Sequence, residues 1–137
     1  MKCYAVIDTN VLVYSLLTKN LDSATVTVMK LIVNGIVTPV FSDDILKEYN
    51  DVLRRKKFHF SEDRIQRLLN IFSYFGLEIT PHRVDCELPD PKDTPFYEVT
   101  MEVSEYNGYL VTGNKKHFPI NPYIADAKEF VDIVKDL

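Results

Sequence analysis

Short apolar runs alternate with segments of helical period along the whole chain. The runs that predict strands cover residues 3–7, 36–41, 77–80, 109–112 and 123–125. The segments that predict helices cover residues 21–34, 43–55, 61–75 and 95–106, and a last helix begins at Asp126. This alternation is typical of an α/β fold in which right-handed crossovers place helices on both faces of a mostly parallel sheet.

Capping residues mark where two of these helices begin. Ser61 precedes an apolar helical stripe, and Asp126 is followed three residues later by Glu129, as in a capping box. The prolines at 81, 89 and 91 interrupt the pattern, and we expect them to mark loops. Because the chain has the length of one domain, we expect a single domain over residues 1–137.

The composition predicts a folded, cytoplasmic protein. Hydrophobic residues make up 46% of the chain and charged residues 26%, which excludes a disordered chain. Cys3 and Cys86 form no zinc-binding cluster, and two isolated thiols without a signal peptide favour a reducing compartment. No apolar run approaches the roughly 18 residues of a membrane span. The formal net charge of −4 means that any polyanion must meet a local basic patch.

Asp8 is the first candidate for chemistry. The apolar run 3–7 has the pattern of a strand buried on both faces, so Asp8 lies just beyond its carboxyl end. Open parallel sheets bind ligands at that edge, where a carboxylate can serve metal or phosphate chemistry. The alternative is that Asp8, Thr9 or Asn10 only caps a following helix.

Glu48 and Asp93 are two further acidic candidates. Glu48 borders the apolar stripe of the helix over 43–55 and can lean over the sheet edge, although a solvated helix flank is the simpler explanation. Asp93 comes two residues before Pro95, which suits a first helical turn, so helix capping explains Asp93 adequately. Asp90, which lies between two prolines, has the character of a turn residue.

A second buried strand, over 109–112, ends in the same manner as the first. Its last residue, Thr112, is followed by Gly113 and Asn114. If the two strands are neighbours where the strand order reverses, Asp8 and Asn114 face one crevice. Asp93 then lies at the start of the helix that leads into the second strand.

In this order and spacing, four motifs resemble those of the PIN-domain family of nucleases. They are Ile-Asp-Thr-Asn-Val at Asp8, Ile-Leu-Lys-Glu-Tyr at Glu48, Asp-Pro-Lys-Asp-Thr-Pro-Phe-Tyr-Glu at Asp93, and Leu-Val-Thr-Gly-Asn-Lys-Lys-His-Phe-Pro at Asn114. Each motif is weak alone, but four in register over nearly the whole chain are specific. The resemblance implies a three-layer α/β/α PIN-like fold with about five strands. The last two motifs are similar to those of a bacterial branch described as toxin components of toxin–antitoxin systems.

The resemblance implies a metal-dependent ribonuclease. Phosphodiester cleavage needs an activated water and neutralisation of charge in the transition state, and divalent cations held by carboxylates supply both. The implied catalytic residues are Asp8, Glu48, Asp93 and Asn114, of which the three acids bind Mg²⁺ or Mn²⁺. Since crowded carboxylates repel, we expect at least one raised pKa in the metal-free site. The implied supporting residues are Asp90, Asn10 and Thr112.

Asn114 departs from the wider family pattern, which has a fourth acidic residue at this position. An amide oxygen can coordinate Mg²⁺, yet it brings no charge to offset the cation, so we expect weaker affinity for a second metal. The bacterial branch shares this asparagine, which favours a variant site over an inactive one. Asp90 is a candidate substitute carboxylate.

Basic residues near the motifs are candidates for binding RNA phosphates. Arg54 and Arg55 end the helix over 43–55, and Lys115 and Lys116 follow the strand over 109–112. Favourable charge at a helix C-terminus explains the two arginines equally well. We interpret His117 as a loop or packing histidine, because a metal-activated water does not require it as a base.

Two other functions remain open. A PIN fold that has lost full metal binding would be a module for RNA or a protein partner, which Asn114 and the acidic net charge favour. A phosphatase or phosphotransferase with Asp8 as nucleophile fits less well, because phosphatases of the haloacid dehalogenase type have a second Asp where this chain has Asn10. The resemblance also implies a homodimer and, for the toxin branch, a small antitoxin protein as partner.

Overall fold

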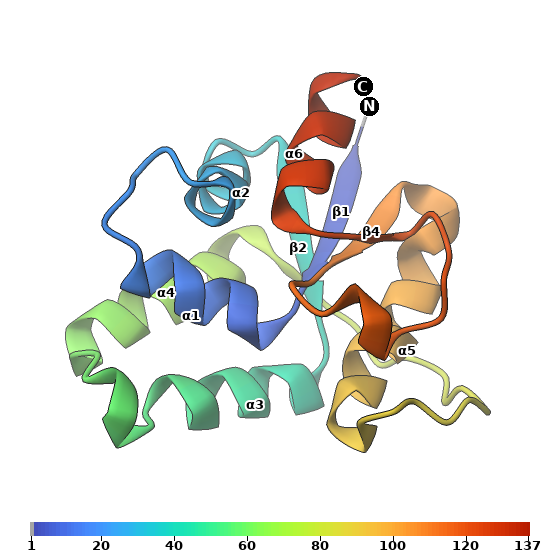
Figure 1. The fold of residues 1–137 in the computed structure, drawn as a ribbon, viewed down its shortest axis with the longest axis horizontal. Coiled ribbons are helices and arrows are strands. Elements are labelled where there is room, and N and C mark those ends of the chain that lie inside the picture. The colour runs from blue at the N-terminus through green and yellow to red at the C-terminus, as the bar shows by residue number, and fades with distance from the viewer. Residues whose placement is uncertain (1) are drawn as a thin grey trace.

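The computed structural model describes residues 2–137, which form one parallel sheet and six α-helices (Figure 1). The strands are β1 (Cys3–Ile7), β2 (Val37–Phe41), β3 (Leu77–Glu78), β4 (Gly108–Val111) and β5 (Ile124–Ala125). The helices are α1 (Thr9–Leu17), α2 (Ala24–Val33), α3 (Asp43–Leu53), α4 (Glu62–Phe75), α5 (Thr94–Val103) and α6 (Ala127–Lys135). The predicted α/β class is confirmed, and the sheet is entirely parallel.

The strand order is β3-β2-β1-β4-β5, so the direction of the chain reverses beside β1. The chain first moves outward from β1 through β2 to β3 and then crosses back to β4. With right-handed crossovers, the returning helix α5 must cover the opposite face from the helices of the outward path. Figure 1 shows α5 on one side of the strands and α1, α2 and α4 on the other, which gives the expected three layers.

The predicted helices are confirmed to within a few residues, except that the pattern leaves α1 unpredicted. Its buried apolar residues Val11, Leu12 and Val13 are consecutive, so no single apolar stripe marks the helix. The predicted caps are present, because the Ser61 side chain accepts from a backbone N–H and Asp126 forms a capping box. Among residues 2–137, no helix combines the length and the apolar character needed to cross a membrane.

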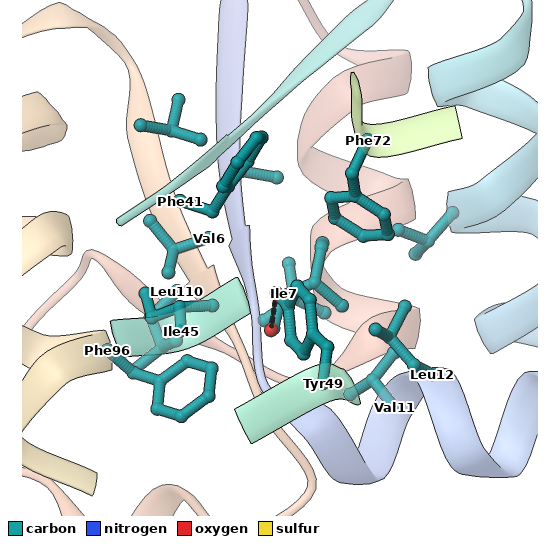
Figure 2. Packing of buried hydrophobic residues seen from close by; sticks show 14 of the residues in the cluster. Val6, Ile7, Val11, Leu12, Phe41, Ile45, Tyr49, Phe72, Phe96 and Leu110 are labelled. Carbon is teal, nitrogen blue, oxygen red and sulfur yellow. Dashed lines mark hydrogen bonds between the residues drawn. The ribbon is translucent and has the colours of Figure 1, made fainter. Parts of the chain in front are cut away.

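A buried aromatic residue connects α3 to the central strand. The Tyr49 ring centroid lies 5.1 Å from that of Phe72 and 6.2 Å from that of Phe96. Its hydroxyl donates a hydrogen bond of 2.5 Å to the Ile7 carbonyl at the end of β1 (Figure 2). Since Glu48 precedes Tyr49 in α3, this contact fixes the position of Glu48 relative to the end of β1.

Candidate active site

Asp8 lies at the carboxyl end of β1, beside the point where the strand order reverses. β1 pairs with β4 so that Ile7 is opposite Val111, and the Asp8 N–H donates to the Val111 carbonyl over 2.9 Å. Asp8 occupies the N-cap position of α1, but its side chain makes no capping bond. Its Oδ2 instead accepts a hydrogen bond of 2.6 Å from the Thr112 hydroxyl. The capping explanation is therefore wrong for Asp8, which is held, 5% exposed, at the ligand-binding edge.

Glu48 reaches the same edge of the sheet from α3. Its Oε2 accepts a hydrogen bond from the hydroxyl of Thr9, the residue that directly follows Asp8. The side chain is half-buried as a result of this position. The simpler explanation, a solvated residue on the helix flank, is therefore wrong.

Asp93 directly precedes α5 and also makes no side-chain capping bond. Its Oδ2 accepts a hydrogen bond of 3.2 Å from Nδ1 of His117, and its side chain is 15% exposed. His117 is a loop histidine as expected, since it lies in the 3-10 turn Lys115–His117 after β4, and it also contacts a candidate catalytic residue. Asp90 is a turn residue as expected, because its side chain accepts from the Lys92 N–H and its carbonyl from the Asp93 N–H, both over 3.0 Å.

Burial and the charges of neighbouring carboxylates raise the pKa values of all three carboxyl groups. Burial is the main reason that the pKa of Asp8 rises from 3.8 to about 6, and the charges of Asp93 and Glu48 raise it further. The hydrogen bond from Thr112 opposes this rise. The pKa of Glu48 is raised by burial and by the charge of Asp93, and that of Asp93 by burial and by the charge of Asp90. The expected raised pKa is therefore confirmed, and the acids after β1, in α3 and before α5 lie within electrostatic range of each other.

The donor set suits a hard divalent cation. Carboxylate, carboxamide and hydroxyl oxygens are the ligands that such cations prefer, and a cation would relieve the repulsion among the acids. In residues 2–137, however, no group of three or more His, Cys, Asp or Glu side chains is positioned to hold a metal. Each carboxylate accepts a hydrogen bond from a different side chain. The residues therefore fit Mg²⁺ or Mn²⁺ by the chemistry of their oxygen donors.

A comparison with protein families matches most of the chain. The family model described as a PIN domain covers residues 4–116, which include all four candidate catalytic residues. The chain belongs to the PIN-domain family. A search of curated proteins found no match to it. PIN domains are generally nucleases and typically use divalent metals. The match is to the PIN family as a whole and does not distinguish the bacterial toxin branch.

Thr112 connects the turn after β4 to the Asp8 carboxylate of this PIN domain. Its hydroxyl donates to Asp8 and accepts from the Asn114 N–H over 3.0 Å, and the residue is fully buried. Asn114 also lines a hollow together with Asn10, and Asp8, Glu48 and Asp93 are not among the residues that line this hollow.

Two of the predicted basic residues are engaged in ion pairs within the protein. Arg54 contacts Glu62 with Nε 2.6 Å from Oε1 and Nη2 3.1 Å from Oε2. Lys115 contacts Glu129 with Nζ 2.7 Å from Oε1. Phosphate binding by Arg54 or Lys115 would therefore compete with an existing partner.

Other basic side chains lie near the candidate acids or are exposed to solvent. Arg55 and Lys92 both lie close enough to Glu48 for their charges to oppose the rise in its pKa. Arg55 and Lys116 are exposed. Of the predicted basic residues, Arg55 and Lys116 are thus the better placed to meet a phosphate.

Three residues contact or face the candidate acids although the sequence pattern does not predict them as catalytic or supporting residues. Thr9 holds Glu48, His117 holds Asp93, and Lys92 faces Glu48. Each of the three lies inside one of the four motifs, within three residues of a predicted catalytic residue. That proximity is the signal by which they could have been found.

Proposed function

We propose that this PIN domain is a metal-dependent endoribonuclease that hydrolyses phosphodiester bonds. The observation that carries the proposal is the electrostatic coupling of three acids from separate elements: Asp93 raises the pKa of both Asp8 and Glu48. Burying like charges beside one another is unfavourable unless a cation or a substrate group compensates for it. Such clusters with perturbed pKa values are characteristic of functional sites.

The proposed ligands of Mg²⁺ or Mn²⁺ are Asp8, Glu48 and Asp93. When bound, the cation supplies an activated water and neutralises charge that develops on the phosphate. Thr112 and Thr9 orient the first two carboxylates by donating hydrogen bonds to them.

The remaining residues of the site have supporting roles in this proposal. His117 orients Asp93 through its hydrogen bond to Oδ2. Asn114 completes the catalytic set as a neutral group that positions substrate. Asp90 acts through its charge, because its own side chain is bonded to a backbone N–H in the turn.

RNA is the proposed substrate. Since the net charge of the chain is −4, the RNA phosphates must bind at a local basic surface. Arg55 and Lys116 make the first contacts. Arg54 and Lys115 contribute when they exchange their glutamate partners for phosphates.

Cleavage of RNA and DNA oligonucleotide panels tests the proposal. The wild-type protein should cut RNA with Mn²⁺ or Mg²⁺ and lose this activity in EDTA, and Asp8→Asn should be inactive. Asp132→Asn, which removes an exposed carboxylate from α6, is the matched control and should retain full activity. Cleavage at the wild-type rate by Asp8→Asn would refute the proposal.

A second candidate function is a non-catalytic module that binds RNA or a protein partner. It is favoured by the neutral Asn114 and by the finding that no group of acids or histidines in residues 2–137 is positioned to hold a metal. Isothermal titration with Mn²⁺ separates the two functions. The nuclease should take up the ion specifically and lose that uptake in Asp8→Asn, whereas the module should show no specific uptake.

We further propose that the protein acts in the cytoplasm as the toxin of a toxin–antitoxin pair, as a homodimer that a small antitoxin protein neutralises. The support is the resemblance of the Asp93 and Asn114 motifs to those of the bacterial toxin branch. Expression in a bacterium should arrest growth, and Asp8→Asn should not. Light scattering should give the mass of a dimer, and co-expression of a small protein encoded beside the gene should restore growth.

A further inference from the structure

A hollow of about 270 Å³ lies at the turn after β4, beside Gly113 and Asn114, and has no part in the proposed metal chemistry. It is formed by α1, the first turns of α2 and α6, and the turn after β4. The residues of interest in its lining are Asn10, Tyr14, Thr25, Gly113 and Asn114.

The lining combines an aromatic ring with two carboxamides. Tyr14 is 57% exposed, so much of its ring is available to a ligand. Asn10 and Asn114 each carry a hydrogen-bond donor and an acceptor, and Thr25 adds a hydroxyl group. Asn114 stands at the N-cap position of a short 3-10 helix without capping it, which leaves its carboxamide free for a ligand.

The hollow is linked to the catalytic carboxylates through a single hydroxyl group. The Thr112 Oγ1 bonds to the Asp8 carboxylate on one side and to the Asn114 N–H on the other. A ligand in the hollow is thus held one turn away from Asp8. Lys116, two residues beyond Asn114, is exposed and can meet a phosphate attached to that ligand.

We propose that this hollow binds one unstacked base of single-stranded RNA, with the base stacked on Tyr14 and its edge hydrogen-bonded by Asn10 and Asn114. The inference rests on the proposed ribonuclease function and assigns to it a hollow that binds a base. Stacking on an aromatic side chain together with hydrogen bonds to the base edge is how proteins bind splayed single-stranded bases, and a paired base cannot offer that edge. Asn114 suits this role because a carboxamide has both a donor and an acceptor, whereas a carboxylate only accepts.

Binding of short single-stranded RNA at low ionic strength, measured by fluorescence anisotropy in EDTA, tests the proposal without cleavage. One nucleotide at a time is replaced by an abasic ribose. For the wild-type protein, removal of the base at one position should weaken binding at least about fivefold. Tyr14→Ala should bind the intact and the abasic RNA equally, and Tyr14→Phe, which keeps the ring, should behave like the wild type.

Filling the hollow gives a second, independent variant. A Cβ at Gly113 meets no atom within 4 Å, so Gly113→Leu can enter the hollow without a clash with the backbone. It should bind intact RNA no better than the wild type binds the abasic RNA, and its thermal unfolding should show an intact fold.

The proposal is overturned if no abasic position weakens wild-type binding, if Tyr14→Ala retains the dependence, or if duplex RNA binds as tightly as the single strand. Because these measurements contain no metal, their failure leaves the cleavage test of the nuclease untouched. Conversely, base-dependent binding by a protein that cuts nothing would refute the nuclease alone.

Discussion

Replacing Asp8 with Asn should stabilise the metal-free protein at neutral pH while abolishing the proposed cleavage. The pKa of Asp8 in the folded protein is about 6, above its ordinary value of 3.8, so the folded state binds this proton more tightly than the unfolded chain does. The contribution of Asp8 to the free energy of unfolding is therefore highest below pH 3.8 and falls as the pH rises to about 6. At pH 7 the ionised carboxylate imposes its full penalty, which the substitution removes.

The size of the effect follows from the difference between the two pKa values. A shift of roughly two pH units corresponds to about 3 kcal/mol at pH 7. The asparagine keeps an acceptor for Thr112 but buries a new NH₂ group, and leaving that group without partners costs about 1–3 kcal/mol. This cost does not depend on pH. The stability of Asp8→Asn relative to wild type should thus rise by about 2 kcal/mol between pH 4 and pH 7.

Urea unfolding in EDTA at a series of pH values measures this difference. Asp132→Asn, which changes an exposed aspartate of α6, is the matched control and should show no comparable change. Saturating Mn²⁺ should then stabilise the wild type and leave Asp8→Asn unaffected, because an ion that binds only the folded state adds its binding free energy to stability. A stability difference between Asp8→Asn and wild type that stays constant from pH 4 to pH 7 would refute the reasoning.

Three further substitutions test the contacts that hold the site. Thr112→Val keeps the shape of the side chain but removes the donor to Asp8, so chemical denaturation at pH 7 should show a loss of about 2 kcal/mol, smaller at pH 4; an equal loss at both pH values would contradict this. Tyr49→Phe leaves the Ile7 carbonyl without its hydroxyl donor, so the free energy of unfolding should fall by about 1 kcal/mol, and no change would show that the bond is neutral. His117→Ala should lower the apparent affinity for Mn²⁺ in the cleavage assay roughly tenfold or more, as expected for a residue that orients a metal ligand. His117→Gln, which retains a donor, should restore part of this affinity, and a wild-type Mn²⁺ dependence in His117→Ala would exclude the positioning role.

The convergence of the candidate residues could be predicted because the sheet is parallel. Two buried apolar runs end in polar residues at Asp8 and Thr112, and parallel neighbours bring such ends to one edge. The structure pairs Ile7 with Val111 and joins Asp8 to Thr112 by a hydrogen bond, as the shared crevice requires. The backbone of Asn114 lies beside this contact, because its N–H donates to the Thr112 hydroxyl, and the residue also lines the neighbouring hollow. That its side chain joins the acids stays a prediction. Strand ends fix where a backbone passes, but not which way the side chains of the following turn point.

What the sequence did not reveal depends on tertiary contacts. α1 is buried along consecutive residues, so its apolar positions show no helical stripe. Thr9 has the residue type of a helix cap, yet its hydroxyl donates to Glu48, 39 residues away. His117 meets Asp93 only because the turn after β4 and the start of α5 lie together at one end of the sheet. None of these contacts has a local sequence pattern, because each depends on how distant segments pack.

The hydrogen-bond donors to the carboxylates indicate why the site suits a metal ion that binds from solution. Asp8 and Glu48 are each bonded to a threonine hydroxyl, and no ion pair among residues 2–137 joins either acid to a lysine or arginine. An arginine against Asp8 would lower its pKa and occupy the oxygens that a metal needs. The shortest ion pairs of Arg54 and Lys115 instead lie with Glu62 and Glu129, away from these acids. A fold that buries Asp8 and Glu48 while giving them only neutral hydrogen-bond donors accepts a loss of stability that a bound divalent cation can reverse.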